Sequence, residues 1–134
     1  MQTNAELAYL DSSALVKLIE TERETPALRA FLAERPGRVS AALARVEVVR
    51  AAGRRGPDVV AVAQTLLDGL EMIKLTDDLL DAAGRLDPPA LHSLDAIHIS
   101  AALALQPASL VFISYDERQA AAARSVGLRV VAPD

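Results

Sequence analysis

Short apolar runs alternate along the chain with stretches in which apolar residues recur at helical spacing. The runs of strand length predict buried β-strands at residues 7–10, 38–40, 71–75, 110–114 and 128–132. Helical spacing predicts helices over about 14–20, 25–34, 41–53, 57–70, 77–86, 94–105 and 117–126. Because strands that alternate with helices form parallel sheets covered on both faces, the expected fold class is α/β. We expect a three-layer α/β/α sandwich with a short parallel sheet of about five strands.

Small hydroxyl residues stand where several of these helices are expected to begin. Their side chains accept hydrogen bonds from free backbone N–H groups at a helix start. Caps are therefore predicted at Ser12 or Ser13, Thr25, Ser40, Thr76 and Ser93. No internal repeat or long linker interrupts the pattern, so one domain over residues 1–134 is expected.

Composition narrows the class of protein. Hydrophobic residues make up 51% of the 134 positions and charged residues 24%, as in an ordinary globular domain. There is no cysteine, which excludes a disulfide framework and a thiolate zinc site. No apolar run approaches ~18 residues and no signal-like start is present, so we expect a soluble, cytoplasmic protein without membrane contact.

Charge is unevenly distributed along the chain. The net charge of −4 is unlike that of most nucleic-acid-binding proteins, which are basic. Seven arginines nevertheless fall within residues 29–55, whereas five aspartates fall within residues 77–95. Such a basic stripe can attract an anion although the whole molecule is acidic, and it can equally be a solvated helix face.

Four carboxylates stand at positions that invite explanation. Asp11 directly follows the first predicted strand, and Asp116 lies just past the fourth. Ligands of open parallel sheets bind at the carboxyl ends of the strands, so both residues are expected at one edge. Glu47 lies between two valines, and Asp95 lies on a helix face that continues with apolar residues. A charge in such surroundings is costly unless it is paired or binds a ligand.

Each carboxylate also has an ordinary structural interpretation. Asp11 can be a turn residue, and Asp116 can cap a helix. Glu47 can pair with an arginine on its own helix, and Asp95 can be stabilised by the helix dipole. Four carboxylates at one edge would nevertheless repel one another unless a cation lay between them. Hard oxygen ligands without cysteine favour Mg²⁺ or Mn²⁺ over zinc.

Four segments carry a resemblance to a known family: "YLDSSALVKL" (9–18), "ARVEVVRA" (44–51), "LDAIHISAAL" (94–103) and "FISYDERQAAAARSVGLRVVAP" (112–133). In this order they resemble the PIN-domain nucleases, specifically the VapC-type toxins of toxin–antitoxin pairs. The resemblance implies a five-stranded parallel sheet and a metal-dependent endoribonuclease that leaves 5′-phosphate and 3′-hydroxyl ends. It also implies a homodimer and a cognate VapB-like antitoxin that inhibits by occupying the active-site groove.

The resemblance assigns roles residue by residue. The catalytic residues that it implies are the four acids Asp11, Glu47, Asp95 and Asp116. The ligands of Mg²⁺ or Mn²⁺ would be Asp11, Asp95 and Asp116, with Glu47 completing the cluster. The supporting residues that match the family pattern are Ser12, Ser114 and Arg118.

Other residues are candidates on chemical grounds alone. RNA contacts are expected from the arginines of the basic stripe nearest Glu47, namely Arg45, Arg50, Arg54 and Arg55. Tyr115 is the one aromatic candidate for base stacking. His92 and His98 are possible acid–base groups, although His98 lies three residues from Asp95 and can simply hydrogen-bond that carboxylate.

Rival classes make different demands on the sequence. A haloacid-dehalogenase-type phosphatase would need a second aspartate where Ser13 stands, and a receiver domain would need a late lysine, but none follows Lys74. A non-enzymatic binding module remains open, because residues 15–32 place apolar side chains at helical spacing. A housekeeping PIN nuclease outside any toxin pair is a further alternative.

Overall fold

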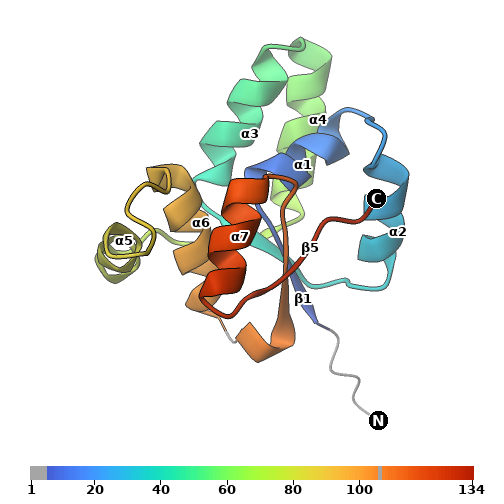
Figure 1. The fold of residues 1–134 in the computed structure, drawn as a ribbon. Coiled ribbons are helices and arrows are strands. Elements are labelled where there is room, and N and C mark those ends of the chain that lie inside the picture. Colours follow the sequence, from blue (N-terminus) through green and yellow to red (C-terminus); the bar gives the residue numbers. More distant parts are fainter. Residues whose placement is uncertain (1–5, 106) are drawn as a thin grey trace.

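The computed structural model describes residues 6–105 and 107–134, in which strands and helices alternate (Figure 1). The first half of the chain contains β1 (Leu7–Leu10), α1 (Ser12–Ile19), α2 (Thr25–Ala33), β2 (Arg38–Ala41), α3 (Ala44–Gly53) and α4 (Pro57–Asp68). The second half contains β3 (Glu71–Ile73), α5 (Asp77–Gly84), α6 (Ser93–Leu103), a short 3₁₀ turn (Pro107–Ser109), β4 (Leu110–Ile113), α7 (Glu117–Ser125) and β5 (Arg129–Val131).

One parallel sheet forms the centre of the fold. Its strand order is β3-β2-β1-β4-β5, so β1 lies in the middle with β2 on one side and β4 on the other. The last residues of the two central strands, Leu10 and Ile113, are paired in register. The predicted three-layer α/β/α sandwich with a five-stranded parallel sheet is confirmed.

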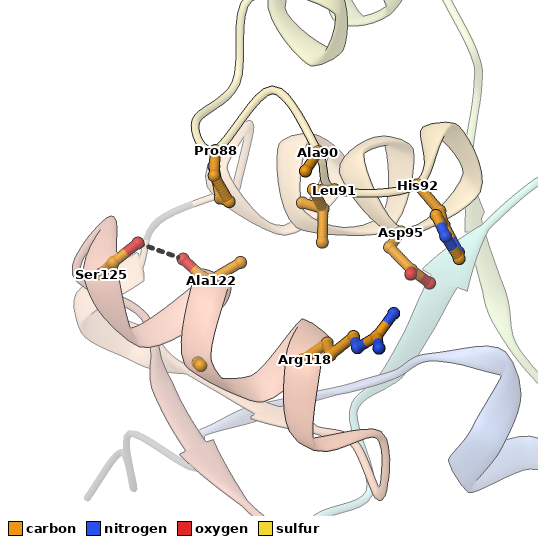
Figure 2. A pocket seen from close by; sticks show the side chains of 9 residues that line it. Pro88, Ala90, Leu91, His92, Asp95, Arg118, Ala122 and Ser125 are labelled. Atoms are coloured by element: carbon orange, nitrogen blue, oxygen red, sulfur yellow. Dashed lines mark hydrogen bonds between the residues drawn. The ribbon is translucent and has the colours of Figure 1, made fainter.

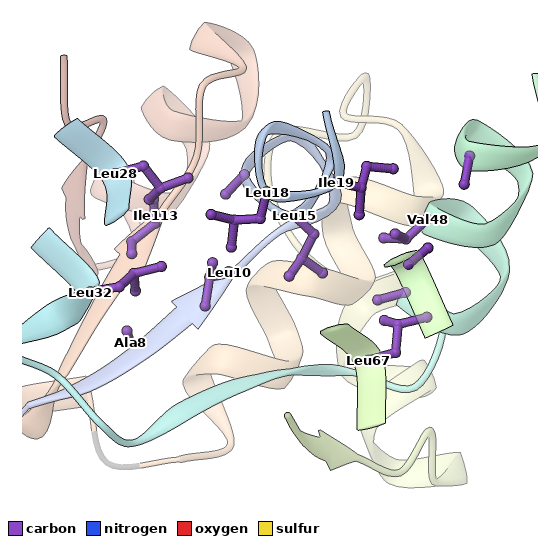
Figure 3. Close-up of a cluster of buried hydrophobic side chains, with 14 of the residues drawn as sticks. Ala8, Leu10, Leu15, Leu18, Ile19, Leu28, Leu32, Val48, Leu67 and Ile113 are labelled. Carbon is purple, nitrogen blue, oxygen red and sulfur yellow. The ribbon is translucent and has the colours of Figure 1, made fainter. Parts of the chain in front are cut away.

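The two faces of the sheet are covered by different helices. Successive side chains of a strand point to opposite faces, so Leu10 belongs to one core and Tyr9 to the other. The first core joins the sheet to α1, α2, α3 and α4, and Figure 3 shows Leu10 among side chains such as Leu15 and Val48. The second core joins the sheet to α5, α6 and α7 and contains Phe112 and Ile99. Both central strands are therefore buried on both sides.

Helix capping departs from the prediction at α1 and α2. Asp11, rather than Ser12 or Ser13, caps α1, since its side chain accepts a hydrogen bond from the backbone N–H of Ala14. Thr25 is the first residue of α2 and not its cap; its hydroxyl donates to the backbone carbonyl of Lys17 at 2.7 Å. A hydroxyl group at a helix start therefore need not act as a cap, since it can form a hydrogen bond with another backbone group instead.

The predicted caps at Ser40 and Ser93 are also wrong, whereas the one at Thr76 is confirmed. Ser40 lies inside β2, where its hydroxyl donates to the backbone carbonyl of Leu10 at 2.7 Å. Ser93 is the first residue of α6, and His92 occupies the cap position without a side-chain hydrogen bond. Thr76 caps α5 by accepting a hydrogen bond from the N–H of Leu79.

The parallel arrangement fixes where the functional residues can gather. All strands end at the same edge of the sheet, and the residues that follow β1 and β4 there are Asp11 and Ser114. Open parallel sheets bind their ligands at this edge. Among the helices of the described residues, none has the length and apolar character needed to cross a membrane.

Candidate active site

Asp11 lies at the end of the central strand and is 1% exposed. Its Oδ1 atom accepts hydrogen bonds from the Ser13 hydroxyl at 2.6 Å and from the Ala14 N–H at 2.9 Å. Within the described part of the chain, the carboxylate forms no ion pair. Burial raises the pKa of the Asp11 carboxyl above its ordinary value, although the surrounding hydroxyl and amide donors oppose this rise.

The residues after β4 are tied to the same place. The backbone N–H of Asp11 donates to the carbonyl of Ile113 at 3.2 Å, and the N–H of Tyr115 donates to the Ser13 hydroxyl at 2.9 Å. Ser13 thus connects the ends of β1 and β4. Asp116 follows as the cap of α7, as its ordinary interpretation predicts.

Asp95 approaches this edge from the first turn of α6. Gln119 of α7 is 2% exposed, and its side-chain Nε2 donates to the backbone carbonyl of Asp95 at 3.3 Å. The Oε1 atom of the same amide accepts a hydrogen bond from the Ser114 hydroxyl at 3.2 Å. Gln119 therefore holds the start of α6 against the end of β4. Sequence reasoning missed it, and the available signal was a lone amide in an alanine-rich helix.

Glu47 reaches the site from the first turn of α3. Its Oε1 atom lies 2.7 Å from Nε2 of His98, and its Oε2 atom accepts a longer hydrogen bond from the Ser12 hydroxyl at 3.4 Å. The pairing of Glu47 with an arginine on its own helix is absent from the described residues, as is the bond from His98 to Asp95. The reason is that His98 points into the core, where it is 1% exposed and faces Glu47.

A buried chain of polar groups continues behind Glu47. The hydroxyl of Tyr9 lies 2.7 Å from Nδ1 of His98, and the Tyr9 ring stacks on Phe112 with a centroid separation of 5.1 Å. Burial raises the pKa of Tyr9 well above its ordinary value, so its hydroxyl remains a donor. If Tyr9 donates to Nδ1, the ring proton of His98 is assigned to Nε2, where it is donated to Glu47. The core thus fixes the orientation of the Glu47 carboxylate.

The candidate arginines do not share one environment. Arg55 pairs with Glu20 at 2.6 Å, and its guanidinium also donates to the backbone carbonyl of Ala51. Arg45 and Arg50 are exposed on α3. Arg54 lines a hollow of about 520 Å³ beside the acids, together with Lys17, Glu47 and Asp116. Arg54 is therefore the arginine of this group that lies nearest the site.

Tyr115 is less available for stacking than the sequence indicates. The Lys17 ammonium lies 4.8 Å from the centroid of its ring, and its hydroxyl donates to the backbone carbonyl of Pro133 at 2.7 Å. Arg118, by contrast, turns its guanidinium from α7 toward Asp95 across a second hollow (Figure 2). Asp95 thus lines the second hollow, whereas Glu47 and Asp116 line the first.

The electrostatics of the edge reflect several carboxylates close together. Partial burial is the main cause that raises the pKa of Asp95, and the charges of Asp116 and Asp11 raise it further. In residues 6–105 and 107–134, no three acidic or histidine side chains converge closely enough to form a complete metal-binding group as they stand. The donor chemistry still suits a hard divalent cation, because the buried Asp11 carboxylate has no cationic partner among these residues.

The comparisons with known proteins agree on one family. The family model of the PIN domain matches residues 8–125, and the chain belongs to this family. Its curated relatives include Ribonuclease VapC46 of Mycobacterium tuberculosis, which is 42% identical over 125 residues, covering 93% of this chain and 96% of that relative. The predicted likeness to VapC-type proteins is thereby confirmed.

Solved structures show the same fold at lower sequence identity. Mycobacterium tuberculosis VapC20, a sarcin-ricin loop cleaving toxin, superposes with a TM-score of 0.74 at 18% identity, covering 94% of this chain and 99% of that chain. A toxin–antitoxin complex from Klebsiella pneumoniae superposes with a TM-score of 0.72 at 22% identity, covering 95% and 98% of the two chains. At these identities the likeness concerns the fold alone.

The buried carboxylate of Asp11 leads to a prediction about stability. Because its pKa is raised in the folded state, its contribution to stability is present at low pH and is lost as the pH rises through the raised value. Asp11→Asn keeps the cap acceptor and removes the charge, so in EDTA at neutral pH it should raise the free energy of unfolding by about 1 kcal/mol. Urea unfolding between pH 4 and pH 7 should show this gain growing with pH.

The matched control is Asp58→Asn, at an exposed first-turn position of α4. It removes a favourable helix-dipole charge and should leave stability unchanged or slightly lower. A lower unfolding free energy for Asp11→Asn than for the unsubstituted protein at neutral pH would show that the buried carboxylate does not destabilise the folded state.

Proposed function

We propose that this protein is a metal-dependent endoribonuclease that acts as the toxin of a toxin–antitoxin pair. The observation that carries the proposal is the placement of four acids from four separate elements at the carboxyl edge of the sheet: Asp11, Glu47, Asp95 and Asp116. Likeness to the VapC ribonucleases supports RNA as the substrate. In this proposal the protein is cytoplasmic, and its substrate is cellular RNA.

The chemistry of the donors supports a divalent cation. Asp11, Asp95 and Asp116 would hold Mg²⁺ or Mn²⁺, which carboxylate oxygens favour. Such an ion lowers the pKa of a bound water and stabilises the charge that develops on a phosphodiester. Burial raises the pKa of Asp95 and the neighbouring carboxylates raise it further; the positive charge of the ion would offset this repulsion.

The protein's own groups have separate tasks in this proposal. The Glu47 carboxylate is held by His98 and Ser12 beside the proposed metal ligands. It can orient the attacking water or accept a proton from it. Arg54 and Lys17 line one hollow next to the acids and can bind a phosphate of the RNA backbone. Ser114 and Gln119 position the loop that carries Asp116.

The partners follow from the same likeness. The superposition on a toxin–antitoxin complex supports an antitoxin as a partner. In the proposal, this VapB-like antitoxin covers the acidic edge and so blocks RNA. A homodimer is part of the proposal because the family generally forms one. The exposed apolar side chains of Val46 on α3 and Leu94 on α6 are available for such contacts.

The first test is cleavage of RNA by the partner-free protein. With Mg²⁺ or Mn²⁺, total cellular RNA should give discrete fragments, and EDTA should abolish them. Asp11→Asn should lower the cleavage rate by more than about a hundredfold, since even outer partners of metal ligands are worth about 10–100-fold. Asp58→Asn is the matched control and should cleave like the unsubstituted protein. Equal cleavage by Asp11→Asn would place the chemistry elsewhere, and absence of cleavage in every arm would contradict the nuclease proposal.

The chain from Tyr9 through His98 to Glu47 gives a second prediction. Tyr9→Phe keeps the ring that stacks on Phe112 but removes the hydroxyl that fixes the His98 tautomer. We expect kcat to fall about tenfold, as for other positioning partners, with KM nearly unchanged. The lost buried hydrogen bond should lower the unfolding free energy by about 1 kcal/mol.

Thr76→Ala controls for that loss of stability. It removes the cap of α5, which costs about as much, at a place that contacts none of the four acids. Its kcat should be unchanged when both variants are measured by steady-state cleavage of one RNA. Equal kcat for Tyr9→Phe and Thr76→Ala would show that the hydrogen-bonded series from Tyr9 to Glu47 has a purely structural role.

A further inference from the structure

The second hollow beside the acids is not used by the proposed chemistry. It has a volume of about 500 Å³ and lies between the segment that leads into α6, the first turn of α6 and one side of α7. Figure 2 shows Asp95 and Arg118 approaching one another at one end of the hollow, with Pro88 toward the other end on the same side as Asp95. Because Asp95 lines the hollow, whatever occupies it lies next to the acids.

The walls of the hollow combine planar and apolar groups. The lining is largely apolar and includes Leu91, from the segment before α6, and Ala121, from α7. The imidazole of His92 and the guanidinium of Arg118 stand at the end nearest Asp95. Among the described residues, neither planar group forms a side-chain hydrogen bond or an ion pair, and both residues are exposed.

This combination suits a planar, largely uncharged ligand. Unpaired RNA bases are bound by stacking on aromatic rings, histidine included, or on arginine guanidinium planes. The aromatic rings elsewhere in the described chain are already engaged. Tyr9 and Phe112 are fully buried, Arg35 covers Phe31, and Lys17 covers Tyr115.

We propose that this hollow, lined by Leu91, His92, Asp95, Arg118 and Ala121, binds one unpaired nucleobase of the RNA next to the cleaved phosphodiester. The inference rests on the proposed function and adds a site for the base to it. An anionic phosphate suits the hollow less well, because most of its lining is apolar and its polar end contains the Asp95 carboxylate. The phosphates would lie instead over the acids and toward Arg54 in the first hollow.

The test couples a change in the hollow to a change in the RNA. A short single-stranded RNA that the protein cleaves at one bond is made with an abasic residue on either side of that bond. One of the two abasic substitutions should lower kcat/KM by about tenfold, the usual contribution of a stacked base. Ala121→Leu fills the hollow from an exposed helix position and should cause a similar loss on the intact RNA.

Non-additivity is the decisive result. On the abasic RNA, Ala121→Leu should cause no further loss, because both changes remove the same contact. His92→Ser removes the ring, leaves a good helix cap and should behave in the same way. Ala61→Leu, at an exposed position of α4 outside the hollow, is the matched control and should cleave both RNAs like the unsubstituted protein.

Other outcomes would overturn the inference in distinguishable ways. Independent, additive losses, or no loss from either abasic substitution, would show that no base enters the hollow although RNA is cleaved. Unchanged cleavage by Ala121→Leu together with weaker inhibition by the antitoxin would assign the hollow to the protein partner instead. Absence of RNA cleavage by the unsubstituted protein would refute the proposed function itself, and the base site with it.

Discussion

The pairing of β1 with β4 at the centre of the sheet is the constraint on which the site depends. Leu10 and Ile113 are in register, so the next residues of both strands emerge side by side at the carboxyl edge. The N–H of Asp11 is bound by the carbonyl of Ile113, and Ser13 accepts the N–H of Tyr115. A shift of one residue in this register would turn Tyr9 and Leu10 to the wrong cores. The apolar cores on the two faces therefore also determine where Asp11 stands.

This arrangement concentrates negative charge at one edge of the sheet, although Asp11 and Asp116 also cap α1 and α7. Asp11 is buried without an ion pair in the described chain, and partial burial, followed by the charges of Asp116 and Asp11, raises the pKa of Asp95. The edge is nevertheless held together by uncharged groups such as the Ser13 hydroxyl and the Gln119 amide. In the proposed function, carboxylates that are fixed in place and short of positive charge favour the binding of a divalent cation. In the proposed function, stability is given up at this edge for catalysis, as is common at active sites.

The sequence was sufficient to predict the layers and the edge at which the acids gather. Because periodicity is a local property, the predicted bounds of the strands and of most helices agree with the structure to within a few residues. The parallel topology follows from the succession of strands and helices along the chain. The predicted helix caps at Ser40 and Ser93 are wrong because the hydrogen-bond partner of a hydroxyl group depends on which backbone groups the folded chain brings near it. Ser40, for example, donates to Leu10, thirty residues away in the chain.

The polar chain behind Glu47 lay beyond prediction for the same reason. Tyr9 and His98 are 89 positions apart, and nothing in either local segment indicates that their side chains meet. Histidine three residues after an aspartate on a helix favours a local bond, but burial turned His98 toward Glu47 instead. Local motifs thus single out the four acids as candidates, whereas the groups that contact them depend on tertiary packing.

Calorimetric titration of Mn²⁺ into the partner-free protein tests the central claim most directly. If the acidic edge is a cation site, binding should be saturable and should release protons from the carboxyls whose pKa is raised, increasingly so as the pH is lowered. Asp95→Asn should abolish this binding, whereas Asp78→Asn, at an exposed position of α5, should leave it unchanged. No binding by the unsubstituted protein, or equal binding by Asp95→Asn, would contradict the account.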